Sequence, residues 1–141
     1  MSFQSNGTDI TLVAAADLSG KQFYAVKVDS NGKAALCVAG DFAIGMLQNK
    51  PASGEQGTVR IAGVSKGAAG GSITAGNLLA ADANGKLVAA TLSRTNTSDG
   101  GAAVDALLGS NVVGVALESA SSGEIFAVAL ALAGASPTTI A

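Results

Sequence analysis

The sequence has 141 residues, a formal net charge of −2 and an isoelectric point near 4.8, with 13% of its residues charged. This length predicts a single domain large enough to bury a core. The few and scattered Lys and Arg residues argue against nucleic acid and anionic membranes as partners. No apolar run approaches the roughly 20 residues of a membrane span. Because so little of the surface can be charged, we expect part of it to be buried against other subunits.

The chain is expected to begin with an arm, residues 1–13, which is mostly polar but contains Phe3. The arm has neither the basic nor the apolar region of a signal peptide, so we expect synthesis and folding in a cytoplasm. A single β domain over residues 14–134 is expected to follow, and then a C-terminal tail, residues 135–141. Pro137 prevents that tail from extending a central strand.

Strands are predicted where apolar runs alternate with turn residues. We place them near residues 9–14, 22–29, 33–38, 42–48, 57–64, 77–82, 86–92, 111–118 and 124–132. Asn31-Gly32 and Asn84-Gly85 mark hairpins, because Asn-Gly tolerates positive φ at both positions. The glycine run at 66–72 is interpreted as a flexible connector. The pattern predicts an all-β fold, a small barrel-like or sandwich-like domain.

The sequence contains an internal repeat. The pattern Asp-x-Asn-Gly-Lys at 29–33 recurs 53 positions later at 82–86, each time between two apolar runs. Further along, 42–47 resembles 112–117, and 53–61 resembles 121–128. The repeat predicts two loosely repeated strand-turn-strand units, at about 14–66 and 72–130, with extra residues in the second around 93–110.

One segment within these extra residues, 98–109, predicts a short helix. Ser98 or Asp99 is a suitable N-cap and Gly109 a suitable C′ residue. Val104, Leu107 and Leu108 would share one face of this helix. We favour a plug over the open end of the sheet, since apolar helix faces usually cover cores. In the alternative, these three residues are subunit-contact candidates.

The residues of common active sites are missing. The chain has no histidine, which removes Ser-His-Asp and Cys-His devices and histidine metal ligands. Cys37 lies in an apolar run and is expected to be a small buried hydrophobe. The segment from Asp29 resembles a calcium loop but has Lys33 and Gly40 where oxygen ligands belong. We therefore predict no enzyme, no catalytic or metal residues and no cofactor.

At the level of turns and strands, the chain resembles the capsid cement (head decoration) proteins of tailed phages. The resemblance is carried by a Ser-Gly turn at 19–20 before the strand that ends in Asp-x-Asn-Gly-Lys, and by Ile-Gly-Met-Leu at 44–47. It continues through the Gly-rich strand at 54–64 and through 74–79 to 114–117, so that it covers roughly residues 14 to 130.

The resemblance implies a small β domain that docks on the outer surface of the mature, expanded head. It implies a homotrimer near three-fold or quasi-three-fold positions that ties neighbouring capsomers together, with the major capsid protein as partner. The protein would occupy the host cytoplasm before assembly and the outer capsid surface of the virion afterwards. Within the arm and the strand after it, we take Phe3, Gln4, Asn6 and Ile10 as capsid-contact candidates, although such an end is equally often frayed.

Three other functions stay open. The same small-residue β composition suits another virion component, such as a tail, spike or fibre domain. A hydrolase that uses carboxylates would need a concave site with a perturbed Asp or Glu, which the sequence does not display. A carbohydrate-binding module is disfavoured because the chain has no Trp and only one Tyr, Tyr24.

Overall fold

The computed structural model describes residues 7–90, 92–99, 102–109 and 111–131. This part of the chain is all-β, as the sequence predicts, and it contains no helix. The strands are β1 (Thr8–Val13), β2 (Ala25–Val28), β3 (Ala34–Leu36), β4 (Gly45–Leu47), β5 (Gln56–Ala68), β6 (Leu78–Ala81), β7 (Leu87–Ala89), β8 (Leu92–Asp99), β9 (Ala102–Gly109), β10 (Gly114–Ala116) and β11 (Ile125–Leu130).

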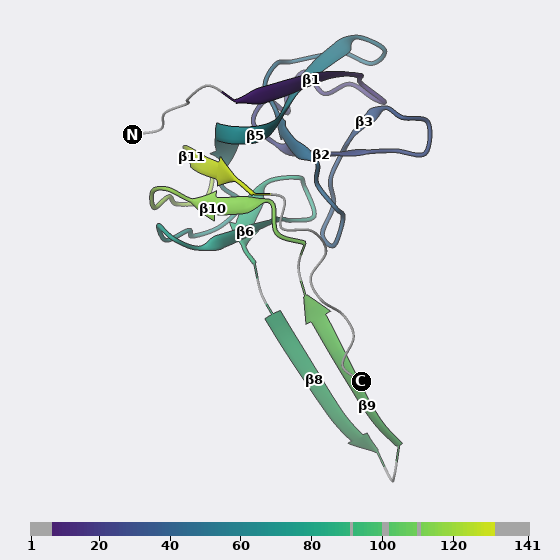
Figure 1. The fold of residues 1–141 in the computed structure, drawn as a ribbon, viewed down its shortest axis with the longest axis vertical. Helices are drawn as coiled ribbons and strands as arrows, with labels where there is room; N and C mark the ends of the chain where they lie inside the picture. The colour runs from purple at the N-terminus through teal and green to yellow at the C-terminus, as the bar shows by residue number, and fades with distance from the viewer. Residues whose placement is uncertain (1–6, 91, 100–101, 110, 132–141) are drawn as a thin grey trace.

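Nine of these strands form one curled sheet with antiparallel ladders. Its order is β3-β2-β4-β5-β11-β10-β6-β7, and β1 also pairs with β5. The other two strands, β8 and β9, pair only with each other, and Figure 1 shows their hairpin apart from the large sheet. The chain therefore consists of a closely connected sheet and one added hairpin.

The large sheet is built twice from the same arrangement. In the β2–β3 hairpin Val26 pairs with Leu36, and 53 positions later in β6–β7 Leu79 pairs with Ala89. Beyond the added hairpin the offset is 69, so that Gly45 pairs with Val26 and Gly114 with Leu79. We call two residues related in this way twins. The offset changes because β8–β9 has no counterpart earlier in the chain.

The two halves of the sheet are called the first and second units. The first unit contains β1, β2, β3, β4 and the start of β5, and the second contains the end of β5, β6, β7, β10 and β11. We define these units by strand pairing, while the division of the chain into an arm, one domain and a tail stays a prediction. Residues 8–13, expected in the arm, form β1 and pair with β5.

The 13-residue strand β5 belongs to both units. Its first half pairs with β1 and β4, and its second half pairs with β11. Gly63 lies between the halves with φ +95°, a conformation that glycine adopts without strain. Lys66, Gly67 and Ala68 belong to this strand, so the interpretation of 66–72 as a flexible connector is wrong for its first three residues.

The two Asn-Gly hairpins are confirmed, but with longer loops than two residues. The Gly32 N–H donates to the Asp29 carbonyl at 3.0 Å, and the Asp29 N–H donates to the Lys33 carbonyl at 2.9 Å. Gly32 has φ +75°, and its preceding Asn31 is not in the positive region. Each loop is thus a three-residue connection with a type I turn and a glycine bulge. In the β2–β3 loop, the Asp29 carboxylate accepts hydrogen bonds from the Asn31 and Lys33 N–H groups, both at 2.9 Å, and so stabilises the turn.

The short helix predicted at 98–109 is wrong. Residues 98 and 99 lie in β8 and 102–109 in β9, and the two strands pair without a break, from Leu92 opposite Gly109 to Asp99 opposite Ala102. The sequence at 99–101, Asp-Gly-Gly, suits a hairpin turn as well as a helix start, and the Thr and Ser residues before it favour a strand. Three apolar residues in five positions do not by themselves distinguish the helical period from a strand. The plug over the sheet is therefore also wrong.

Each unit has its own buried apolar residues, and the two sets correspond in order. The first unit buries Ala14, Leu18, Val26, Leu47 and Val59, and the second buries Ala69, Ile73, Leu79, Ala116 and Val128. The last three pairs are twins by the offsets of 53 and 69, and the first two correspond at an offset of 55. The second set is continuous with a junction core between the units, which includes Ala25, Cys37, Ala43, Met46, Leu87 and Phe126. Cys37 is fully buried, as expected from its apolar run.

Candidate binding surfaces

The rim of the junction between the units carries aromatic rings and lysines. The Lys66 ammonium lies 5.6 Å from the centre of the Phe23 ring, and the Lys21 and Lys86 ammonium groups lie 5.2 and 5.9 Å from that of Tyr24. These distances are within the range of cation–π attraction. Since Lys66 and Lys86 come from the second unit and the rings from the first, the contacts also join the units.

Phe23 is held in an unfavourable backbone conformation. Its φ is +68°, which costs an L-residue with a bulky side chain roughly 1–2 kcal/mol. Its twin in the second unit is Gly76, at φ +90°. The N–H of each donates to the same position of the neighbouring strand, Phe23 to Leu47 and Gly76 to Ala116. The turn therefore requires the left-handed conformation, and the first unit tolerates the strain of a phenyl ring there.

Two ion pairs are formed among the described residues. The Lys27 ammonium donates to Asp41 at 2.7 Å, and the Val38 N–H donates to the same carboxylate oxygen at 2.9 Å. These two bonds hold the pKa of Asp41 below its usual value, and the carboxylate raises the pKa of Lys27. The Arg60 guanidinium donates to Asp9 at 2.8 Å and so ties β5 to β1.

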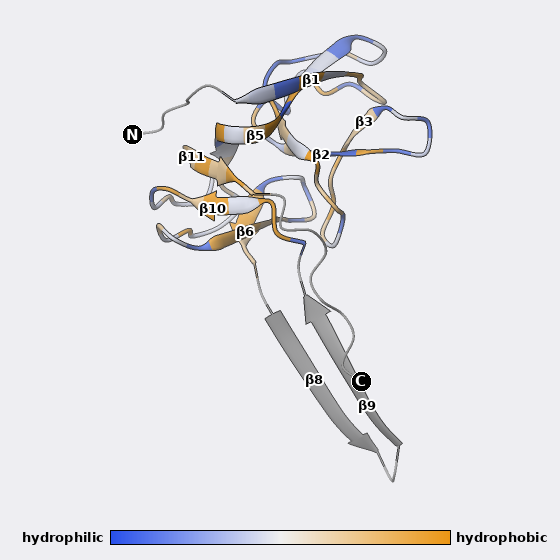
Figure 2. Cartoon of the chain, in the orientation of Figure 1, coloured by the Kyte–Doolittle hydropathy of each residue, from blue (hydrophilic) through white to orange (hydrophobic). Residues whose placement is uncertain are grey.

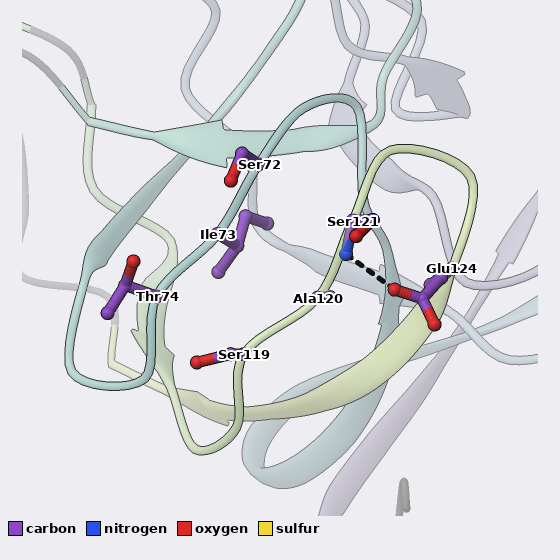
Figure 3. Close-up of a pocket in the computed structure, with 7 residues that line it drawn as sticks. All are labelled: Ser72, Ile73, Thr74, Ser119, Ala120, Ser121 and Glu124. Atoms are coloured by element: carbon purple, nitrogen blue, oxygen red, sulfur yellow. Dashed lines mark hydrogen bonds between the residues drawn. The ribbon is translucent and has the colours of Figure 1, made fainter.

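An open hollow of about 350 Å³ lies at one end of the second unit. Figure 3 shows its lining, which consists of Ser72, Ile73, Thr74, Ser119, Ala120, Ser121 and Glu124. Two of the polar side chains there accept hydrogen bonds from backbone N–H groups. Glu124 accepts from the Ser121 N–H at 2.6 Å, and the Ser119 hydroxyl accepts from the Ala75 N–H at 3.0 Å.

The lining of the hollow is made of a few hydroxyl side chains, two apolar residues and one carboxylate. The hydrogen bond found for that carboxylate comes from the Ser121 backbone N–H, not from a hydroxyl. The turn that carries Glu124 is the twin of a turn in the first unit, where Glu55 accepts from the Ala52 N–H at 2.7 Å. We therefore interpret this carboxylate as a repeated turn cap. In the described ranges no three His, Cys, Asp or Glu residues are grouped to hold a metal ion.

The structure places four of the seven contact candidates that the sequence singled out. Phe3, Gln4 and Asn6 lie outside the described residues. Ile10 lies on β1, and its side chain is half-buried against the core of the first unit. The three subunit-contact candidates, Val104, Leu107 and Leu108, lie on β9. The contacts of both groups stay predictions.

Sequence reasoning missed two surface features, the strained Phe23 and the exposed Leu78. Leu78 is 53% exposed, whereas its twin Ala25 is fully buried. Aligning the two copies residue by residue would have put Phe23 opposite Gly76 and shown the first feature. Whether Ala25 or Leu78 is buried depends on tertiary packing, so no signal in the sequence predicted that Leu78 is exposed.

These observations define a class of protein: a duplicated antiparallel sheet whose described part offers contact surfaces and no catalytic constellation. The sequence matches the family model of the phage cement proteins over residues 4–111, and the chain belongs to this family. It is thus a structural protein of the phage virion that associates with the capsid, as the resemblance implied. Within the described ranges, no helix has the length and apolar character needed to cross a membrane.

Comparison with solved structures shows the same fold in another phage protein. The N base of the head fiber gp8.5 of bacteriophage phi29 matches with a TM-score of 0.59 and 15% sequence identity. The match covers 92% of this chain and 98% of that one. At this identity the likeness concerns the fold alone. No sequence among the curated proteins matched the chain.

Proposed function

We propose that this protein binds the outer surface of a tailed-phage head, through the major capsid protein, and stabilises the mature lattice as a homotrimer. The observation that carries the proposal is the cement-family match over residues 4–111, which spans the first unit and much of the second. In this proposal the protein acts by contact alone, without catalysis or a cofactor. It occupies the host cytoplasm before assembly and the virion surface afterwards.

The physical basis is linkage between binding and assembly. A protein that binds the assembled lattice and not its separated subunits shifts the equilibrium toward the lattice. A trimer that engages three sites adds the benefit of effective concentration, so individually weak interfaces suffice. The low charge of the chain and its exposed apolar residues, including Val38 and Phe42, suit such interfaces.

We assign the capsid contact to the residues ahead of and within β1. Phe3, Gln4 and Asn6 precede the strand, and Phe3 would supply an apolar anchor. Ile10 contributes less, because its half-buried side chain packs on the core of its own chain. Val104, Leu107 and Leu108 on β9 are assigned to contacts between subunits.

Co-sedimentation with heads tests the proposal. Heads of the cognate phage that lack this protein are purified in expanded and unexpanded forms and mixed with the full chain. We expect saturable binding to expanded heads, at a stoichiometry that matches three-fold sites, and a higher temperature of shell disruption. A Phe3→Ala variant should bind more weakly, while a Ser122→Ala variant on the exposed turn before β11 should bind heads as the wild type does. Absence of binding to both forms would refute the proposal.

A second candidate is the base of a head appendage. The observation that favours it is the shared fold with the head-fiber base, of which 98% is covered. The two candidates differ in copy number and in what projects from the particle. Cryo-electron microscopy of complete virions would show a low, regular cap at every equivalent position for a cement protein. An appendage base would instead carry an elongated projection.

A further inference from the structure

One face of the first unit is buried by the second unit. Four apolar side chains form this junction face, each no more than 2% exposed: Ala25, Cys37, Ala43 and Met46. The Ala25 N–H donates to the Gly85 carbonyl at 2.8 Å. The Met46 methyl group lies 3.6 Å from the position that a Cβ on Gly67 would take. Both partners belong to the second unit, so this unit is what covers the junction face.

The second unit repeats this face, which is less buried there by the described part of the chain. The twins of the four residues are Leu78, Ala90, Val112 and Val115, and all are apolar. Leu78 is 53% exposed and the other three are only partly buried. Figure 2 shows β6, which begins with Leu78, in the colour of hydrophobic residues. We call these four residues the open face. Since the same backbone presents the same kind of side chains, the open face repeats the junction face, and the described part of the chain leaves it partly exposed.

The hairpin that covers the junction face is also repeated, and in the first unit the described part of the chain leaves its counterpart exposed. In the second unit the cover includes the β6–β7 hairpin, with Ala81 at the end of β6 and Gly85 in the turn. The twins of these residues are Val28 and Gly32 at the tip of the β2–β3 hairpin. Val28 is 44% exposed, whereas Ala81 is buried. A Cβ built on Gly32 would meet nothing within 4 Å, so the tip is free to be covered.

We propose that the open face of one chain binds the tip of the β2–β3 hairpin of a second copy, in the manner of the internal junction. The interface is head-to-tail, because it joins different surfaces of the two chains. Such interfaces generate closed rings when the rotation between copies allows it. This inference rests on the self-association proposed above and adds the surfaces that produce it.

Sedimentation velocity of the isolated full chain tests the inference without heads. We expect the wild type to self-associate, and both Leu78→Asp and Val28→Asp to be monomeric at the same concentration. The matched control is Ile125→Asp on β11, because Ile125 is 42% exposed but lies outside both surfaces. The control should associate as the wild type does. All three side chains are exposed, and equal melting curves by circular dichroism would show that each variant folds.

Mixing the two monomeric variants tests the head-to-tail geometry. Leu78→Asp keeps an intact hairpin tip and Val28→Asp keeps an intact open face, so the mixture should form 1:1 dimers and nothing larger. A monomeric wild type, an unchanged Leu78→Asp variant or a mixture without dimers would each overturn the inference. The inference would also be overturned if the full chain were monomeric and a chain without residues 132–141 associated, because the tail would then be what covers the open face. A monomeric Leu78→Asp variant that still binds heads would leave the proposed function standing.

Discussion

Replacing the twin glycines Gly32 and Gly85 by alanine measures the packing between the two units. Both have positive φ, +75° and +79°, so each substitution introduces a strain of about 1 kcal/mol or slightly more. The surroundings differ. The new methyl group at position 32 would meet nothing within 4 Å, while at position 85 it would lie 2.5 Å from Leu36 Cδ1 and 3.3 Å from the Cys37 carbonyl oxygen. Overpacking of this kind costs about 1–3 kcal/mol more.

We therefore expect Gly32→Ala to lower the free energy of unfolding by about 1 kcal/mol and Gly85→Ala by about 2–4 kcal/mol. Urea unfolding followed by far-UV circular dichroism gives both values from the shift in midpoint. Both substitutions are made in the Leu78→Asp background, so that association between copies does not contribute. Equal costs, within about 0.5 kcal/mol, would refute the described packing of the β6–β7 turn against β3.

Three further predictions concern single side chains. Burial raises the pKa of the Cys37 thiol to about 12, so a thiol reagent at pH 8 should label it only after unfolding; rapid labelling of the native protein would contradict its burial. The lowered pKa of Asp41 stabilises the fold above the usual Asp pKa, and this contribution is lost as pH falls through the lowered value. Asp41→Asn should therefore flatten the acid side of the stability–pH curve, and an unchanged curve would rule the ion pair out as its cause. Phe23→Gly should change stability by less than about 1 kcal/mol, because relief of backbone strain offsets the lost half-buried ring; a loss above about 3 kcal/mol in urea unfolding would show that the strain is small.

Features encoded by a few adjacent residues were predictable from the sequence. Asp-x-Asn-Gly-Lys located both hairpins, because Asp supplies the side-chain acceptor and Gly the positive φ that the loop requires. The recurrence of this pattern also allowed the duplication to be predicted. The loop length was missed, because Asn31-Gly32 alone does not determine whether one or both residues adopt positive φ.

Features that depend on distant partners were not predictable. Gly67 was interpreted as part of a flexible connector, but it lies in β5, where a Cβ would approach Leu87 Cδ1 at 2.7 Å and Val128 Cγ2 at 2.9 Å. This glycine is required by close packing and not by a turn. Likewise β9 became a strand because β8 supplies its pairing partner, whereas its apolar spacing alone suited a helix.

The sequence predicted individual contact residues, but it did not predict which residues lie together on one surface. The family pattern indicated the virion, and the low charge predicted burial of part of the surface against other subunits, which stays a prediction. The open face could not be recognised, because Leu78 and Ala25 are both apolar and only the position of the second unit buries Ala25.

The shared strand β5 also determines how the sheet responds to a pulling force. Six residue pairs join its first half to β1, and six join its second half to β11. The hydrogen bonds of these antiparallel ladders lie across the strands, so tension along β5 shears many of them together and does not open them one at a time. A force that pulls the first and second units apart is carried along a single uninterrupted backbone segment, β5.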